Sequence, residues 1–272
     1  MTKRLELTIL SDNTVEKRKF LAEHGLSIYF KYNGQQYLFD TGQGEVLVSN
    51  ALKLGIDLKK IDTIFLSHGH DDHTGGLKKL LEINPEIRVF AHSDIFQPKY
   101  KKADEGLEFI GINLDKSDIR NFTAAETTIA AAAGVYNTGE IPAPRASYMN
   151  ERYVVNNEEG ENTDPFDDDT SLYIETENGI VILLGCSHKG VKNIIDVIRG
   201  AVGDKKIAAV FGGMHLKRAG RKEINELIEY FKELDLDLLV PMHCTGRQAA
   251  VLFKEALGDM VQLASVGDKF EI

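Results

Sequence analysis

The sequence has few cysteines, no long apolar run and no block of basic residues. Its two cysteines, Cys186 and Cys244, lack the paired spacing of a disulfide framework. The longest fully apolar runs, such as Ile180 to Leu184, are far too short to span a bilayer. Residues 1–13 lack the apolar stretch of a signal peptide. We therefore expect a cytoplasmic protein without a membrane partner.

The charge and length of the chain narrow the class of partner further. The net charge is -10, and without a Lys/Arg-rich segment the chain is not expected to bind nucleic acid or an anionic membrane. A small-molecule substrate fits this composition better. The 272 residues, of which 43% are apolar, are enough for a substantial core, and we expect one domain over residues 1–272. The oligomeric state is left open.

One segment, Ser67 to Gly76, carries the main functional signal. It follows the apolar run Ile61 to Leu66, which predicts a buried strand. His68 and His70 are two residues apart and project to the same side of an extended backbone, so they can share one metal ion. Asp72 and His73 come at the start of a predicted helix and can hold a second ion.

The residue types in this segment indicate which metals it would take. Neutral imidazole and carboxylate suit zinc, manganese or iron. The sequence has no cluster of cysteines, which argues against a structural zinc site of the cysteine type. A lone histidine in a polar turn is usually only a solvated residue. Three imidazoles and a carboxylate at this spacing favour two divalent metal ions instead, with zinc preferred.

Two segments of the chain share one plan. Residues 27–42 and residues 171–188 each predict a strand, an Asn-Gly turn and a second strand that ends in polar residues. The second half continues with a predicted helix from Val191 to Ile198, then strands that run into His215 and His243. The chain therefore looks like two related halves whose strand ends could meet at one site.

Residues 136–170 do not follow this pattern, because they are rich in Gly, Pro, Asn and acidic residues. A loop of this length in a compact domain is usually a lid or binding loop, or else is disordered. We expect an active-site loop here, since it leads directly into the second hairpin.

These motifs resemble the metallo-beta-lactamase superfamily, whose His-x-His-x-Asp-His pattern is matched by residues 68–73. The resemblance implies an α/β (α+β) fold, a four-layer αβ/βα sandwich of helix, sheet, sheet and helix. It also implies that Asp40 supports the metal-binding loop from behind and that His243 is the last metal-binding histidine. Asp72 is placed to ligate one ion and orient a nucleophilic hydroxide, and His215 could donate to an oxyanion or phosphate, or be only a structural histidine.

The chain also departs from the superfamily pattern. Where a third histidine ligand usually precedes the second hairpin, the chain has Asp167 to Asp169, and where a bridging Asp usually follows a Gly, it has Cys186. His188 is the natural replacement for the missing imidazole. Cys186 could bridge metals or be a small buried residue, and Asp168 or Asp169 could reach a metal or the substrate.

Several functions remain open at this level. The motifs at residues 138–142, 185–188, 212–216 and 241–246 resemble a narrower group named for 7,8-dihydropterin-6-yl-methyl-4-(beta-D-ribofuranosyl)aminobenzene 5'-phosphate synthase. The first hypothesis is a hydrolase of a small phosphate ester, phosphodiester or other ester. The second is a pterin-linked synthase, and the third is a metal-binding sensor without turnover. Arg145 and Lys189 lie beside the motifs and could hold a phosphorylated substrate.

Overall fold

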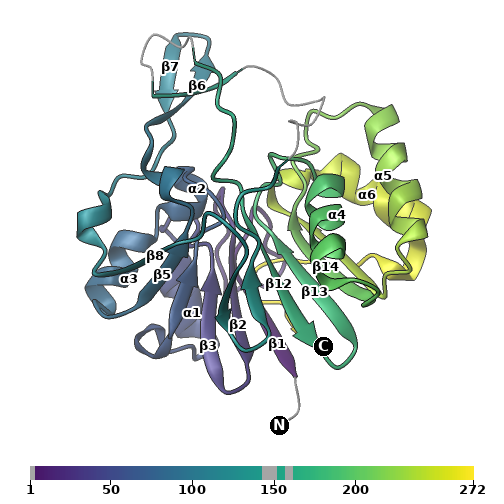
Figure 1. Cartoon of the computed structure of the whole chain (residues 1–272), viewed down its shortest axis with the longest axis horizontal. Helices are drawn as coiled ribbons and strands as arrows, with labels where there is room; N and C mark the ends of the chain where they lie inside the picture. Colours follow the sequence, from purple (N-terminus) through teal and green to yellow (C-terminus); the bar gives the residue numbers. More distant parts are fainter. Residues whose placement is uncertain (1–3, 143–151, 157–161) are drawn as a thin grey trace.

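The computed structural model describes residues 4–142, 152–156 and 162–272. Figure 1 shows two twisted sheets packed face to face, with helices on both outer sides. The order of layers is helix, sheet, sheet and helix, so the expected fold is confirmed.

The first sheet comes from the N-terminal half of the chain, except for its edge strand β16, which is the last strand in the sequence. It has the order β16-β1-β2-β3-β4-β5-β8, and β3, β4, β5 and β8 run parallel. The predicted hairpin is confirmed: Asn33 and Gly34 connect β2 to β3 with φ values of 51° and 80°, which a tight hairpin turn favours. The strand bounds are Leu5–Ser11 (β1), Ser27–Tyr32 (β2), Gln35–Phe39 (β3), Thr63–Phe65 (β4), Arg88–Ala91 (β5), Asn121–Ala124 (β8) and Lys269–Glu271 (β16).

The second sheet comes from the C-terminal half. It has the order β15-β14-β13-β12-β10-β9, with β13, β14 and β15 parallel. The second predicted hairpin is therefore confirmed as β12 and β13. The bounds are Ile129–Ala132 (β9), Val135–Asn137 (β10), Ser171–Thr176 (β12), Gly179–Leu184 (β13), Ile207–Gly213 (β14) and Leu238–Met242 (β15).

A third, smaller sheet stands beyond one end of the sandwich (Figure 1). It joins Lys99–Ala103 (β6) and Gly106–Phe109 (β7) to Tyr153–Val155 (β11). No strand was predicted at β11, which lies inside the segment expected to be an active-site loop. The described part of that segment is thus tied to the rest of the chain by a β-ladder.

Helices cover the outer face of each large sheet, and the helix predicted from Val191 to Ile198 is confirmed within Val191–Val202 (α4). The last α-helix, Arg247–Leu257 (α6), ends at Gly258, which has a φ of 60°. Among the described residues, no helix has the length and apolar character needed to cross a membrane. The helices are Leu47–Leu54 (α1), Asp71–Thr74 (α2), Leu77–Ile83 (α3), Val191–Val202 (α4), Arg221–Glu233 (α5) and Arg247–Leu257 (α6), with single 3-10 turns at Leu58–Lys60, Ser93–Phe96, Lys116–Asp118, His243–Thr245 and Gly258–Met260.

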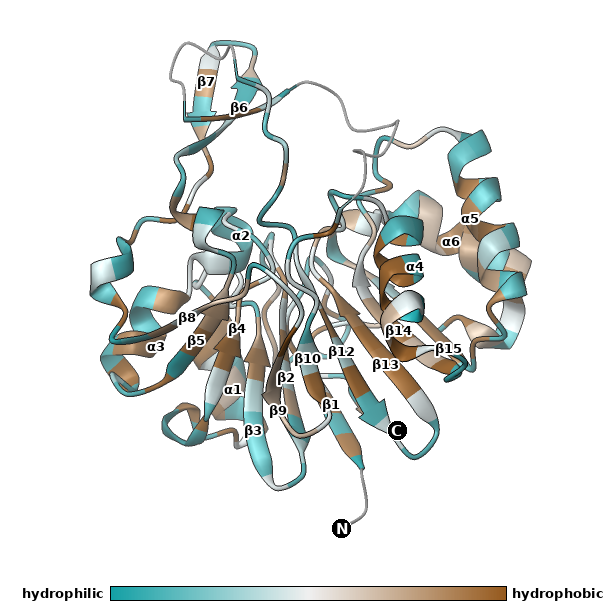
Figure 2. Ribbon diagram, viewed as in Figure 1, coloured by the Kyte–Doolittle hydropathy of each residue, from teal (hydrophilic) through white to brown (hydrophobic). Residues whose placement is uncertain are grey.

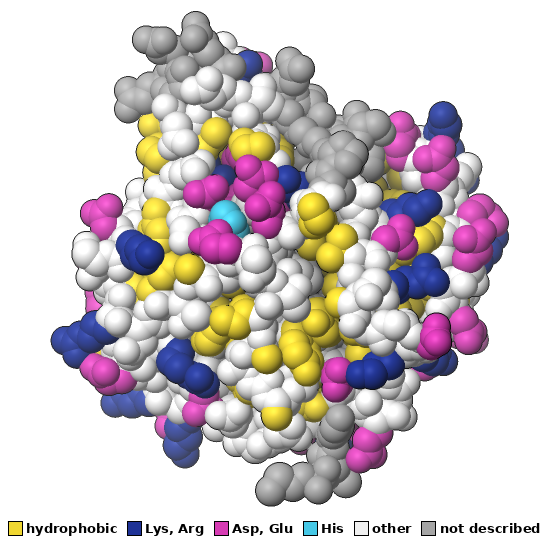
Figure 3. Space-filling view, in the orientation of Figure 1, with side chains coloured by type: hydrophobic (Ala, Val, Ile, Leu, Met, Phe, Trp, Pro, Cys, Tyr) yellow, Lys and Arg dark blue, Asp and Glu magenta, His cyan; other side chains and the backbone are white. Residues whose placement is uncertain are grey.

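Three apolar clusters hold the layers together. The central cluster lies between the two sheets and includes Phe30, Phe65 and Leu183. The other two lie between each sheet and its own helices. Figure 2 shows apolar residues concentrated along the strands of both sheets, with apolar and polar residues mixed along the helices. On the face in Figure 3, basic and acidic side chains are interspersed, without a continuous basic patch.

Replacing Leu183 by alanine should lower the free energy of unfolding by about 2–5 kcal/mol, because the side chain is fully buried between the sheets. Leu52→Ala is the matched control, since Leu52 is 79% exposed and its truncation opens no cavity. Urea unfolding of both variants measures the difference. Equal effects would contradict the assignment of the central core.

Candidate metal centre

The candidate site lies where the parallel strands of both large sheets end. Asp40 follows β3, His68 comes soon after β4, and the second sheet contributes residues after β13, β14 and β15. Asp40, Ser187, His215 and His243 at these strand ends have φ values between 48° and 60°. Non-glycine residues adopt this left-handed conformation at an energetic cost, and such residues concentrate at functional sites.

Asp40 organises the loop that carries the histidines. It is fully buried. Its Oδ1 accepts a hydrogen bond from the backbone N–H of Ser67 at 2.7 Å, and its Oδ2 accepts one from the Ser67 hydroxyl at 2.8 Å. Oδ2 also lies 2.7 Å from His73 Nδ1. Because Asp40 contacts Nδ1 of His73, it is Nε2 of this ring that faces the site. The sequence resemblance implies that Asp40 supports the metal-binding loop, and these contacts favour that role.

His68, His70 and His188 form a first cluster. His68 Nε2 lies 3.0 Å from His70 Nδ1 and 3.3 Å from His188 Nε2. All three side chains are buried. The structure therefore brings His188 next to the two motif histidines, although it is 120 positions from His68 in the chain.

The protonation states of the first cluster suit a metal ion. Burial holds the pKa of each of these three histidines well below its usual value, so the rings are neutral. A divalent cation placed between the nitrogens would be a common partner for their lone pairs. The donor set and its burial thus fit a zinc-like ion.

Asp72, His73 and His243 form a second cluster. His243 Nε2 lies 3.2 Å from His73 Nε2 and 3.3 Å from Asp72 Oδ2. Burial disfavours a charged Asp72, yet His73 and His24 hold its pKa well below the usual range. Burial also opposes a charge on His73, but Asp40 and Asp72 outweigh it and raise the pKa of His73 to about 9.

Side chains outside the sequence motifs complete the second cluster. His24 Nε2 lies 3.2 Å from Asp72 Oδ2. The Oδ1 of Asn13 lies 2.8 Å from His243 Nδ1, and Asp12 accepts a hydrogen bond from the His243 backbone N–H. These loop residues carry no periodic signal, so the sequence did not reveal them.

Cys186 is buried between the elements of the second cluster. Its Sγ lies 3.2 Å from His73 Nε2. Cys186, His68 and His73 together form one possible ligand group. The structure therefore places Cys186 where it could bind a metal, and it also packs the side chain as a small buried residue.

The acidic run before β12 has other partners. Asp168 pairs with Lys99 at 3.0 Å and accepts a hydrogen bond from the N–H of Gly69, between the two motif histidines. Asp169 accepts one from the N–H of Lys189, and burial raises the pKa of Asp169 to about 7. These contacts favour a role in holding the loops over direct binding of metal or substrate.

A cavity of about 360 Å³ opens over both clusters. His70, Asp72, His188 and His243 line it, together with Arg152 and Tyr153 at β11, Lys101 of β6 and Glu108 of β7. The small third sheet is therefore one wall of the cavity. Tyr153 lies 5.5 Å from His70 between ring centroids, and Phe166 stacks on His188 at 4.1 Å.

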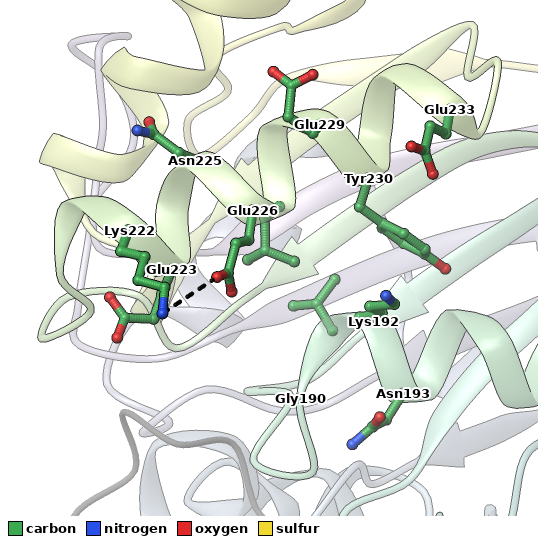
Figure 4. Close-up of a pocket in the computed structure, with 12 residues that line it drawn as sticks. Gly190, Lys192, Asn193, Lys222, Glu223, Asn225, Glu226, Glu229, Tyr230 and Glu233 are labelled. Carbon is green, nitrogen blue, oxygen red and sulfur yellow. Dashed lines mark ion pairs between the residues drawn. The ribbon is translucent and has the colours of Figure 1, made fainter.

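A larger groove of about 800 Å³ lies elsewhere, between α4 and α5 (Figure 4). The side chains that line it include Lys222 and Glu226, which form an ion pair at 3.9 Å, and Tyr230. None of the histidines of the two clusters lines this groove. The candidate chemistry therefore belongs to the smaller cavity.

Of the two residues considered for phosphate binding, Lys189 alone belongs to the described part of the chain. Lys189 Nζ is paired with Asp167 at 2.8 Å, and Lys189 is not among the cavity-lining residues. Arg145 lies outside the described residues. His215 does line the cavity, and its Nδ1 is buried without a hydrogen-bond partner in the described part of the chain.

Comparisons with known proteins agree with this geometry. The sequence profile of the metallo-beta-lactamase superfamily matches residues 22–191. The chain is 33% identical over 263 residues to 7,8-dihydropterin-6-methyl-4-(beta-D-ribofuranosyl)-aminobenzene-5'-phosphate synthase of Methanocaldococcus jannaschii, covering 91% of this chain and 90% of the relative. The crystal structure of Tm1679, described as a metal-dependent hydrolase of the beta-lactamase superfamily, superposes with a TM-score of 0.83 at 29% identity, covering 98% of this chain and 99% of Tm1679. A diphosphatase of the PhnP family, at 16% identity, covers 100% of this chain and 98% of its own with a TM-score of 0.57, and shows the fold alone.

The four-layer sandwich, with histidines at its strand ends, defines the metallo-beta-lactamase fold class. The chain belongs to the metallo-beta-lactamase superfamily.

Lys99→Met should lower the free energy of unfolding by about 3–5 kcal/mol, because it leaves the buried carboxylates of Asp164 and Asp168 without a counter-ion. Lys101→Met is the control, since its partner Glu108 is exposed and such pairs contribute at most about 1 kcal/mol. Denaturant unfolding at neutral pH compares them. Indistinguishable variants would show that the buried ion pair does not stabilise the fold.

Proposed function

We propose that the chain is a metal-dependent hydrolase that acts on a small phosphate ester, phosphodiester or other ester at a dinuclear centre. The observation that carries this proposal is the convergence of six ligand candidates, three in each cluster, four of which (His70, Asp72, His188 and His243) line one cavity. The first ion would be held by His68, His70 and His188. The second would be held by Asp72, His73 and His243, with Cys186 beside it.

Zinc is the proposed ion, with manganese or iron as alternatives, because the donors are mostly imidazole with carboxylate and thiol nearby. When bound, such ions would supply Lewis acidity and would lower the pKa of a bound water toward about 7. The chain itself orients the reactants. Asp72 is held by His24 and His243, and can accept a hydrogen bond from the attacking water through its carboxylate.

His215 lies on the cavity wall and can donate a hydrogen bond to the oxygen that gains charge during attack. The aromatic rings of Tyr153 and Phe166 pack against His70 and His188 and limit the access of bulk water to the first cluster. We further propose that the described part of residues 136–170 acts with the small sheet as a cover over the cavity.

The charges at the cavity mouth support an anionic substrate. Arg152, Lys217 and Arg218 line the cavity, and the buried Nε of Arg152 has no hydrogen-bond partner among the residues that the structure describes. Within the described residues, no carboxylate forms an ion pair with Lys217 or Arg218. Cations in this position can bind a phosphate or carboxylate group and place the adjacent bond over the metal centre.

A second candidate function is a pterin-linked synthase. It is favoured by the 33% identity to the Methanocaldococcus jannaschii synthase over most of both chains. Both functions would use the same ligands, so turnover assays against phosphodiester, phosphomonoester and lactone panels, and against a pterin substrate, distinguish them.

The purified wild-type protein should bind up to two divalent ions per chain, and His70→Ala should lose the ion of the first cluster. His92→Ala is the control, because His92 is also buried but pairs with Glu126 outside the cavity. Elemental analysis after reconstitution with zinc, manganese or iron measures the stoichiometry. Full metal content in His70→Ala would refute the proposed ligand set.

The double substitution Lys217→Ala and Arg218→Ala should raise the KM for a phosphorylated substrate roughly tenfold or more with a smaller change in kcat, since a charged hydrogen bond contributes about 1.5–3 kcal/mol. Lys192→Ala with Lys222→Ala, in the groove between α4 and α5, is the matched control. Steady-state kinetics on the best substrate of the panel decides. An unchanged KM would remove these cations from substrate binding.

A further inference from the structure

Both cysteines of the chain lie beside the candidate metal centre, in a group with His215. Cys186 follows β13, His215 follows β14 and Cys244 follows β15. The two Sγ atoms and a ring nitrogen of His215 lie within 4.8 Å of one another. All three residues line the cavity over the two histidine clusters.

The local backbone brings these donors close together. A side chain at Gly213 could not be accommodated, because its Cβ would lie 2.6 Å from Cys244 Sγ and 3.4 Å from Cys186 Cα. The N–H of His215 donates to Cys244 Sγ at 3.3 Å, and the Cys244 thiol donates to the carbonyl oxygen of Cys186 at 3.6 Å. The left-handed φ of 50° at His215 is part of the same turn.

The chemistry of the group points to a ligand. Nδ1 of His215 is buried and has no partner among the described residues. Two thiols and one imidazole form the donor set that zinc uses in some sites with an open fourth position. Here the fourth position would face the cavity, since all three donors line it.

We propose that Cys186, His215 and Cys244 form a further, thiolate-rich site for a soft divalent ion such as Zn²⁺ or Cd²⁺, next to the two histidine clusters. Cys186 is shared, because its sulfur also lies 3.2 Å from His73 Nε2 and a thiolate can bridge two ions. An imidazole has two ring nitrogens, so His215 can bind this ion through one and face the substrate with the other.

The site gives the centre a preference for thiophilic metals that histidine and carboxylate alone do not supply. The shared Cys186 also connects this further site to the second histidine cluster. Loss of Cys244 should therefore weaken the further ion while leaving the clusters around His68 and His73 able to bind theirs.

The test is titration of the chelator-treated, thiol-reduced protein with Cd²⁺, followed by the ultraviolet thiolate-to-metal charge-transfer band and by elemental analysis. The chain has only two cysteines, so the band reports on Cys186 and Cys244 alone. We expect Cys244→Ser to bind one ion fewer than wild type and to lose about half of the band, in proportion to the thiolates removed. The double variant Cys186→Ser with Cys244→Ser should lose the band entirely.

Two further variants distinguish the thiolate site from the first histidine cluster. His215→Ala should retain both thiols but bind the last ion at least tenfold more weakly. His70→Ala should keep the charge-transfer band, because it lies in the other cluster. Circular dichroism of each apo variant establishes that it is folded.

A band and stoichiometry unchanged in Cys244→Ser would overturn the proposal, and would leave the hydrolase proposal intact if two ions remain bound. A thiol count of zero in unreduced, denatured protein would also overturn it, since the cysteines would then form a disulfide instead of a metal site. Failure of the wild-type protein to bind any Cd²⁺, zinc, manganese or iron would instead defeat the proposed function as well.

Discussion

The hydrogen bonds of the Asp40 carboxylate are the interaction on which the centre depends. A buried carboxylate is costly unless its oxygens are satisfied. Asp40 satisfies both oxygens with Ser67 and His73, and Ser67 Oγ in turn lies 2.9 Å from His68 Nδ1. One side chain after β3 thus orients a histidine of the first cluster and a histidine of the second. The metal-facing nitrogens of both rings are fixed by what their other nitrogens contact.

The packing of the two sheets explains why neither half of the chain alone supplies all the ligand candidates of the site. The first half supplies His68, His70, Asp72 and His73, but the third ligand candidate of each cluster comes from the second half. His188 follows β13 and His243 follows β15, and both reach the first half only because the sheets pack face to face. The apolar cluster between the sheets therefore determines the geometry of the site as much as the ligands do.

Much of the fold and part of the site could be predicted from local sequence. The Asn33-Gly34 turn, the helix after Gly190 and the spacing of residues 68–73 are short-range patterns, in which backbone periodicity fixes which side chains share a face. His24 and the pairing of β11 with β6 could not be predicted in this way. Lys99 and Asp168 are 69 positions apart, and no periodicity links them. Their contact depends on how the small sheet packs, which is a property of the tertiary fold.

That same ion pair connects the cavity wall to the metal-binding loop. Lys99 lies in β6, which pairs with β11 and so with Tyr153 on the cavity wall. Its partner Asp168 holds the N–H of Gly69 at 2.8 Å, between His68 and His70. Burial opposes the charge on Lys99, but Asp168 and Asp164 raise its pKa, so the ammonium stays charged and the ion pair persists at neutral pH. The buried ion pair therefore ties β6, and through β11 the cavity wall at Tyr153, to the backbone between His68 and His70.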